Sequence, residues 1–183
     1  MSSIIPVKVK LKTGVEAIIR NAKLKDAQNL LNITMSVIQE RKYLVTLPDE
    51  FHVKAGDERD WIKLHLDNPN NILLIALIED KIAGAIDFHN IPRIQMQHRG
   101  VFGMLVAKEW RGKGVGSALL AALINWGENN SVIEKISLSV MANNKEALGL
   151  YEKFGFQVEG VNIKECKLKD GSYIDVIQMY RFI

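Results

Sequence analysis

The stretch Arg111-Gly112-Lys113-Gly114-Val115-Gly116 decides the fold of this chain, because it places three glycines between a strand-like run and a helix-like run. Glycine loses more backbone entropy on folding than any other residue, so this density needs a physical reason. Phosphate binding supplies one, since a backbone without Cβ atoms approaches an anion closely and its N–H groups converge at the positive end of a helix dipole. The stretch therefore predicts an anion site.

The glycine spacing argues against two common nucleotide-binding loops. No Gly-Lys-Ser/Thr follows four residues after a glycine, as a Walker A loop requires. The run Gly112 to Gly116 also lacks the interval of the dinucleotide fingerprint G-x-G-x-x-G. A nucleotide-binding protein that uses the same turn remains a competing hypothesis, and it predicts binding of ATP or NAD.

Hydrophobic periodicity outside the turn divides the rest of the chain into strands and helices. Helical spacing predicts helices over 26 to about 38, around 57–66, 116 to about 128 and 144–153. Alternating or apolar runs predict strands over 5–11, 15–20, 72–78, 82–89, 101–106, 135–140, near 156–168 and 173–182. Asp170-Gly171 predicts a two-residue hairpin turn between the last two strands.

Length and composition indicate a single globular domain over residues 1–183, with 48% hydrophobic and 25% charged residues. A net charge of +3 is too small and dispersed to favour nucleic acid. The only cysteine, Cys166, excludes an intramolecular disulfide and gives no zinc signature. No leader sequence or apolar run long enough for a membrane span is evident. We therefore expect a cytoplasmic protein without a membrane segment.

Two motifs together resemble one known family. Arg111, Gly114 and Gly116 match Arg-x-x-Gly-x-Gly, and the segment from Asn144 to Phe156 matches Asn-x-x-Ala-x-x-Leu-Tyr-x-x-x-Gly-Phe. Both are similar to motifs of the GCN5-related N-acetyltransferase (GNAT) superfamily, and they span roughly residues 101–156. The resemblance implies an α/β (α+β) fold with a mixed, mostly antiparallel, strongly twisted sheet and about four flanking helices.

The resemblance also implies that the chain binds acetyl-CoA as co-substrate and needs no metal. The family's cofactor-binding positions correspond here to Leu105, Val106, Arg111, Gly112, Lys113, Gly114, Val115, Gly116 and Asn144. Asn144 is equally suited to cap the helix that follows it. The strand before the turn would hold the pantetheine amides, which requires the neighbouring strand to diverge there.

Direct transfer is the reaction that the resemblance implies, with an amine attacking the thioester. A backbone N–H of Val106 or Leu105 would bind the oxyanion, and Tyr151 would protonate the departing thiolate. Cys166 lies far from both motifs and is interpreted as a packing residue. Many relatives have a glutamate on the strand before the turn, but the strand 101–106 contains no acidic residue. The candidates for the general base are therefore Glu40, Asp87, His89, His98 and water.

The acceptor is expected to be a primary amine of a small molecule or a peptide N-terminus. The overall pattern looks like the branch with ribosomal-protein N-terminal, polyamine and amino-acid-type acetyltransferases. The first helical region, the loop after His89 and the terminal hairpin would enclose the acceptor, and four acidic residues could attract a cationic amine: Asp49, Glu50, Asp57 and Glu58. A homodimer is possible. The alternative function is a non-catalytic acyl-CoA-binding sensor or scaffold.

Overall fold

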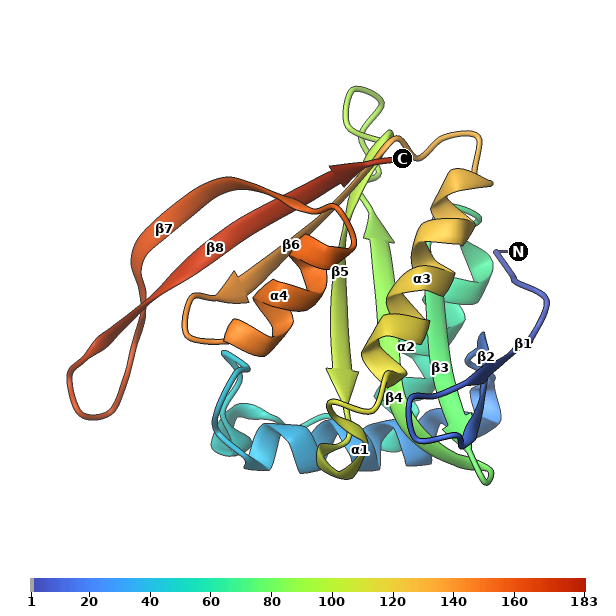
Figure 1. Ribbon diagram of the computed structural model, residues 1–183, viewed down its shortest axis with the longest axis horizontal. Coiled ribbons are helices and arrows are strands. Elements are labelled where there is room, and N and C mark those ends of the chain that lie inside the picture. Colours follow the sequence, from blue (N-terminus) through green and yellow to red (C-terminus); the bar gives the residue numbers. More distant parts are fainter. Residues whose placement is uncertain (1) are drawn as a thin grey trace.

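One eight-stranded sheet runs through the computed structural model, which describes residues 2–183, in the order β1-β2-β3-β4-β5-β6-β8-β7 (Figure 1). All neighbouring strands are antiparallel except β5 and β6, which are parallel. This is the mixed sheet that the sequence predicted. The strands are β1 (Val7–Lys10), β2 (Glu16–Asn21), β3 (Ile72–Ile78), β4 (Lys81–Asn90), β5 (Arg99–Val106), β6 (Lys135–Met141), β7 (Gln157–Lys167) and β8 (Tyr173–Phe182).

Four α-helices cover the two faces of the sheet (Figure 1). Helices α1 (Ala27–Gln39) and α2 (Ala55–Asp67) pack on one face, where their apolar side chains meet Leu73, Ile75 and Ala85. Helices α3 (Val115–Glu128) and α4 (Lys145–Lys153) pack on the other, over a larger core that includes Ile86, Phe88 and Phe102. Within residues 2–183, no helix combines the length and apolarity needed to cross a membrane.

The connection between β7 and β8 is longer than the sequence predicted. Five residues separate Lys167 from Tyr173, where a two-residue turn was expected. The Asp170 carboxylate accepts hydrogen bonds from the backbone N–H and the hydroxyl of Ser172, at 2.9 and 2.6 Å. The chain reverses in a backbone turn, because Gly171 N–H donates to the Leu168 carbonyl at 3.0 Å and Leu168 N–H donates to the Ser172 carbonyl at 2.8 Å, which leaves three residues in the loop.

The strands β5 and β6 separate soon after they begin, and this separation positions the site. They pair only where Arg99, Gly100 and Val101 face Lys135, Ile136 and Ser137. On its other edge β5 stays paired with β4 as far as Val106. Among residues 2–183, no strand therefore pairs with this edge of the second half of β5.

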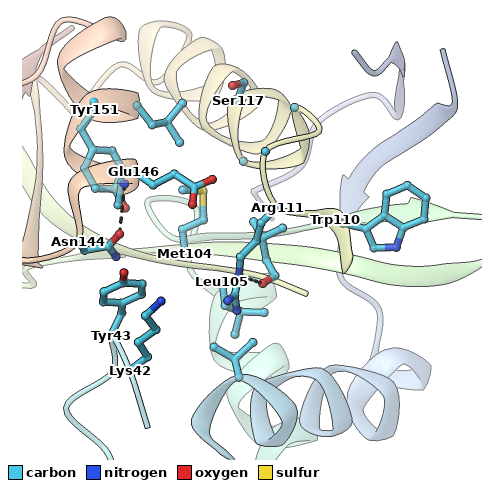
Figure 2. A pocket seen from close by; sticks show the side chains of 18 of the residues that line it. Lys42, Tyr43, Met104, Leu105, Trp110, Arg111, Ser117, Asn144, Glu146 and Tyr151 are labelled. Atoms are coloured by element: carbon cyan, nitrogen blue, oxygen red, sulfur yellow. Dashed lines mark hydrogen bonds between the residues drawn. The ribbon is translucent and has the colours of Figure 1, made fainter. Parts of the chain in front are cut away.

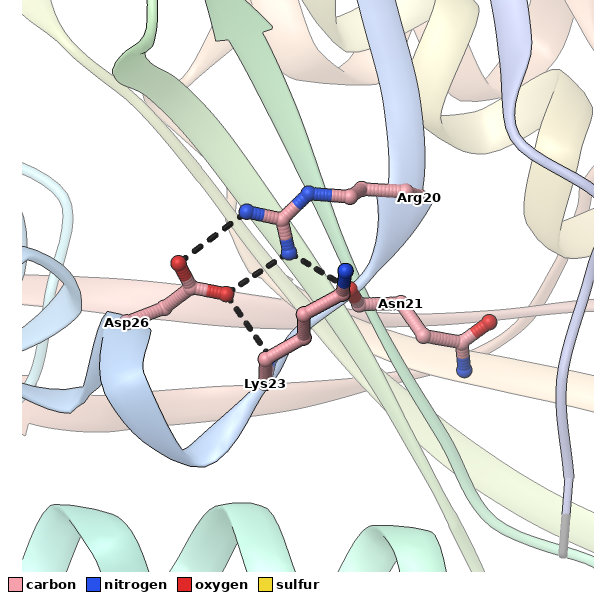
Figure 3. Close-up of polar contacts among 4 residues, drawn as sticks. All are labelled: Arg20, Asn21, Lys23 and Asp26. Carbon is pink, nitrogen blue, oxygen red and sulfur yellow. Dashed lines mark hydrogen bonds and ion pairs between the residues drawn. The ribbon is translucent and has the colours of Figure 1, made fainter.

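A part-buried ion pair joins β2 to the start of α1 (Figure 3). Two nitrogens of the Arg20 guanidinium donate to the two carboxylate oxygens of Asp26 at 2.7 and 3.0 Å, and the backbone N–H of Lys23 donates at 2.7 Å. Burial alone would raise the pKa of Asp26, but the hydrogen bonds and the Arg20 charge outweigh it, so the pKa lies below its usual value. The charged carboxylate is thus the form that folding favours.

Asp26→Ala should lower the free energy of unfolding by about 3 kcal/mol, because it leaves the Arg20 charge partly buried without a partner. Urea unfolding at neutral pH measures this loss. Since the folded pKa is depressed, the contribution is present above the unfolded pKa and is lost as pH falls through the folded value. The control Glu16→Ala removes an exposed pair with Lys8 and should cost less than about 1 kcal/mol. Equal losses in both variants would contradict the assignment.

Candidate active site

A cavity of about 360 Å³ lies where β5 has lost its neighbour. Five parts of the fold line it: Lys12 between β1 and β2, the end of α1 with the loop after it, the second half of β5, the glycine turn with the start of α3, and α4 (Figure 2). Both sequence motifs thus contribute to one cavity, as a shared ligand site requires.

The glycine turn has the backbone geometry that its sequence suggested. Gly112 and Gly114 have φ angles of +69° and +103°, which L-residues rarely adopt. Gly114 is the N-cap of α3, so the N–H groups at the start of the helix have no acceptor within the helix. Lys12 N–H donates to the carbonyl of Lys113 at 3.2 Å and ties the turn to the first hairpin. The turn can therefore present free N–H groups to an anion.

The Arg111 side chain is committed to the protein itself. Two guanidinium nitrogens donate to Glu40 at 2.7 and 2.6 Å, and Nε donates to the carbonyl of Val106 at 3.0 Å. These contacts join the end of α1, the end of β5 and the turn. The resemblance placed Arg111 among the cofactor-binding residues, and in this geometry it contributes by positioning the turn.

Hydrogen-bond alternation determines which β5 groups face the cavity. Ile91 N–H donates to the Arg99 carbonyl, and Ala107 N–H donates to the Ala83 carbonyl. Residues of β5 that bond to β4 therefore recur every second position from Arg99 to Ala107. Leu105 belongs to this set, whereas the N–H of Val106 points away from β4 toward the gap. Of the two proposed oxyanion donors, the geometry favours Val106.

Tyr151 reaches the cavity from α4 and is 7% exposed. Its ring lies edge-on to Phe102, with 5.6 Å between ring centroids, and near Phe156 at 6.0 Å. Burial in this apolar setting raises the pKa of Tyr151 to about 12. The hydroxyl therefore keeps its proton at any ordinary assay pH.

Two further residues of the second motif lie beside Tyr151. Asn144 is the N-cap of α4, and its Oδ1 accepts from the backbone N–H of Ala147 at 3.2 Å. It also lines the cavity, which leaves its amide nitrogen for a ligand. Glu146 projects from α4 toward Met104 and Arg111 (Figure 2). Sequence reasoning assigned no role to Glu146, although it stands between Asn144 and Ala147 in the motif.

The four candidate bases lie in different places. Glu40 lines the cavity, but its hydrogen bonds with Arg111 lower the pKa of its carboxyl and make it a weak base. Asp87 and His89 point to the face of β4 opposite the one that carries the buried Ile86 and Phe88, and neither residue lines the cavity. His98 is also outside it, beside the start of β6, where its carbonyl accepts from Lys135 N–H.

The acidic residues proposed to attract a cationic amine have structural roles instead. Asp49 pairs with Arg41, Glu50 accepts from the N–H of Leu47, and Asp57 accepts from the N–H of Lys54 at the start of α2. Glu58 is buried, and this burial raises the pKa of its carboxyl, with the nearby charge of Asp87 adding to the effect. Acidic residues of the cavity lining are Glu40 and Glu146.

The remaining expectations fall partly inside and partly outside the cavity. Lys113 and Val115 do not line it: the Lys113 ammonium lies 4.9 Å from the Trp110 ring centroid, and Val115 is fully buried. Neither the loop after His89, the terminal hairpin nor Cys166 contributes to the lining. The loop residues Lys42, Tyr43 and Leu44 do contribute. They follow the first helix, a region expected to enclose the acceptor, but the sequence did not single them out because their segment has no periodicity.

Comparison with known proteins agrees with both motifs and the fold. The Acetyltransferase (GNAT) family model matches residues 35–156. The L-amino acid N-acetyltransferase AaaT of Escherichia coli K12 is 30% identical over 91% of this chain and 98% of its own length. An N-alpha-acetyltransferase of Saccharolobus solfataricus is 26% identical, over 88% of this chain and 89% of its own.

A solved structure extends the agreement to three dimensions. The acetyltransferase of GNAT family from Streptococcus pneumoniae superposes with a TM-score of 0.87 at 28% identity, covering 91% of this chain and 99% of that one. Sequence motifs, sheet order and cavity position thus lead to the same family. This chain belongs to the GNAT family of N-acetyltransferases.

Proposed function

We propose that the protein binds acetyl-CoA in this cavity and transfers the acetyl group directly to the primary amine of an amino acid or of a peptide N-terminus. The observation that carries the proposal is the unpaired second half of β5, which ends at a turn of free N–H groups. An extended chain with amide groups adds to an open strand edge, and a pyrophosphate binds at a helix start. Pantetheine joined to pyrophosphate has both features in this order.

In the proposed reaction, the acceptor nitrogen attacks the thioester carbon and the carbon–sulfur bond then breaks. The Val106 N–H stabilises the oxyanion of the tetrahedral intermediate. The hydroxyl of Tyr151 donates a hydrogen bond to the departing sulfur and supplies its proton. The attacking nitrogen loses its extra proton as the intermediate collapses, and this proton returns through water to the Tyr151 oxygen. No covalent enzyme intermediate forms, consistent with the position of Cys166 outside the cavity lining.

The proton of the acceptor ammonium passes to water in this proposal. Glu40 is held in its charged form by Arg111, so it has little tendency to take up a proton. The α-ammonium group of a peptide has a pKa near 8, and the reactive free amine becomes more abundant as pH rises. We therefore expect kcat/KM for the acceptor to rise with pH up to the pKa of its amine.

The charge of the cavity favours an acceptor that carries a carboxylate over a polyamine. Four cationic residues line it, against the two acids Glu40 and Glu146: Lys12, Lys42, Arg111 and Lys153. Lys42 lies on the loop after α1, beside the Tyr43 ring and the apolar Leu44. Its ammonium could pair with the carboxylate of an amino acid. The amino-acid specificity in the name of the Escherichia coli relative supports the same class.

Thiol release from acetyl-CoA, measured across amino acids, their amides, short peptides and spermidine, tests the acceptor class. Amino acids or short peptides should support the highest kcat/KM. Lys42→Glu should lower kcat/KM for an amino acid about tenfold, yet barely change it for the matching amide, which lacks the carboxylate. Lys63→Glu is the control, because Lys63 is exposed on α2 outside the lining. Spermidine as the best acceptor would contradict this class.

A further inference from the structure

A second polar cluster lies on the opposite face of β4 from α3. One ring nitrogen each of His65 and His89, and a carboxylate oxygen of Asp87, lie within 4.8 Å of one another. His65 comes from α2, whereas Asp87 and His89 are alternate residues of β4. The two histidine rings pack edge to face, with 4.4 Å between their centroids. None of the three residues lines the acetyl-CoA cavity.

His65 has a buried ring nitrogen without a partner. The residue is 1% exposed, and its Nδ1 lies 2.9 Å from the carbonyl oxygen of Trp61. A carbonyl can only accept, so Nδ1 carries the proton and Nε2 has a free lone pair. That Nε2 atom has no hydrogen-bond partner among residues 2–183. Metal-binding histidines commonly have this arrangement, with one nitrogen fixed by a backbone carbonyl and the other on the ion.

The cluster also has more negative charge than its surroundings balance. Asp87 contacts His89 at 2.9 Å, and the buried Glu58 is close enough to Asp87 for their charges to repel. In the part of the chain that the structure describes, no lysine or arginine nitrogen lies within 4.0 Å of either carboxylate. A bound cation would compensate the charge of Asp87.

We propose that His65, Asp87 and His89 bind a divalent transition-metal ion of the zinc, nickel or cobalt class. Two imidazoles and one carboxylate are ligands that these ions favour, and water would complete the coordination. Ligand atoms at about 2.1 Å from a tetrahedral ion lie about 3.4 Å apart, so atoms that are now up to 4.8 Å apart need to approach by at most about 1.4 Å. The half-exposed His89 provides an entry path.

The ion would join α2 to β4, the strand next to β5, and β5 is the strand proposed to bind the pantetheine of acetyl-CoA. Asp87 is the β4 partner of Gly103 on β5, and a Cβ at position 103 would lie 3.0 Å from its Oδ1. The missing side chain of Gly103 thus makes room for the Asp87 carboxylate. This site extends beyond the proposed acetyl transfer and does not depend on it.

Titration of chelator-treated, cofactor-free protein with Co²⁺ and Zn²⁺ tests the proposal. The visible absorption of Co²⁺ should saturate at one equivalent, with the intensity typical of an ion that has four or five ligands. Added Zn²⁺ should displace the Co²⁺ and remove this absorption. His89→Ala and Asp87→Asn should each weaken Zn²⁺ binding at least about 100-fold. His52→Ala and Cys166→Ser are controls outside the cluster and should bind like wild type. His89 is partly exposed, so its variant should fold even if a His65 variant does not.

Thermal unfolding gives a second readout that does not involve activity. Zn²⁺ should raise the Tm of the wild type and of His52→Ala but not that of His89→Ala, because binding to the folded state alone stabilises it. The proposal is overturned if the wild type takes up no stoichiometric ion. Binding that survives both His89→Ala and Asp87→Asn, or that disappears in Cys166→Ser, would also overturn it.

Discussion

Tyr151→Phe should lower kcat for the best acceptor by about 100-fold while leaving the dissociation constant of acetyl-CoA within about threefold of wild type. The substitution removes one hydroxyl and keeps the ring that packs against Phe102 and Phe156. In the proposed mechanism, ground-state binding uses the turn and β5, whereas the hydroxyl acts only as the carbon–sulfur bond breaks. A loss confined to kcat is the signature of an interaction made in the transition state.

Steady-state kinetics and calorimetric titration with acetyl-CoA together measure this split. Tyr180→Phe is the matched control, since its hydroxyl contacts Gln157 outside the cavity lining, and it should retain wild-type kcat. Because the pKa of Tyr151 is raised to about 12, its ionisation should not reduce the rate below about pH 11. Any alkaline decline at lower pH must persist in Tyr151→Phe. Wild-type turnover in that variant would remove the tyrosine from the mechanism.

Gly114→Val should weaken acetyl-CoA binding by about 10- to 100-fold. At a φ of +103°, a β-branched residue is strongly strained, and relieving the strain moves the N–H groups at the start of α3. Loss of one charge-assisted hydrogen bond to a phosphate costs about 1.5–3 kcal/mol, which corresponds to this range. Calorimetric titration with acetyl-CoA and with CoA measures the change.

Gly171→Val is the control for the backbone strain itself. Gly171 has a φ of +84° and open space around its Cβ position, and it lies in the β7–β8 connection away from the cavity. Backbone strain should lower the Tm of both glycine variants, but Gly171→Val should bind acetyl-CoA like wild type. Wild-type affinity in a folded Gly114→Val protein would show that the turn does not bind the cofactor.

The sequence predicted the central fold well because its signals there are local. Apolar runs define β3, β4 and β6, and the glycine turn defines the end of β5 and the start of α3. The two-residue turn predicted between β7 and β8 was too short, since backbone hydrogen bonds from Gly171 to Leu168 and from Leu168 to Ser172 close a three-residue loop. Glycine after a turn occurs in hairpin loops of both lengths, so Asp170-Gly171 does not distinguish them.

Sequence reasoning proposed site residues where local motifs contain them, and it could not anticipate contacts between distant parts of the chain. Tyr151, Asn144 and the turn were proposed because two local motifs contain them, and in the structure they line one cavity. Glu40 was a candidate base until its pairing with Arg111, 71 positions away, was known. His65 and His89 come together because α2 packs on the sheet beside β3 and β4, and periodicity does not specify which polar side chains then meet.

A crystal structure of the protein with CoA tests the central claim most directly. We predict that the pyrophosphate lies on the N–H groups of the turn and the first residues of α3, and that pantetheine runs along the open edge of β5. The sulfur should then lie within hydrogen-bonding distance of the Tyr151 hydroxyl and close to the Val106 N–H. CoA bound elsewhere, or with its sulfur out of reach of both groups, would contradict the account.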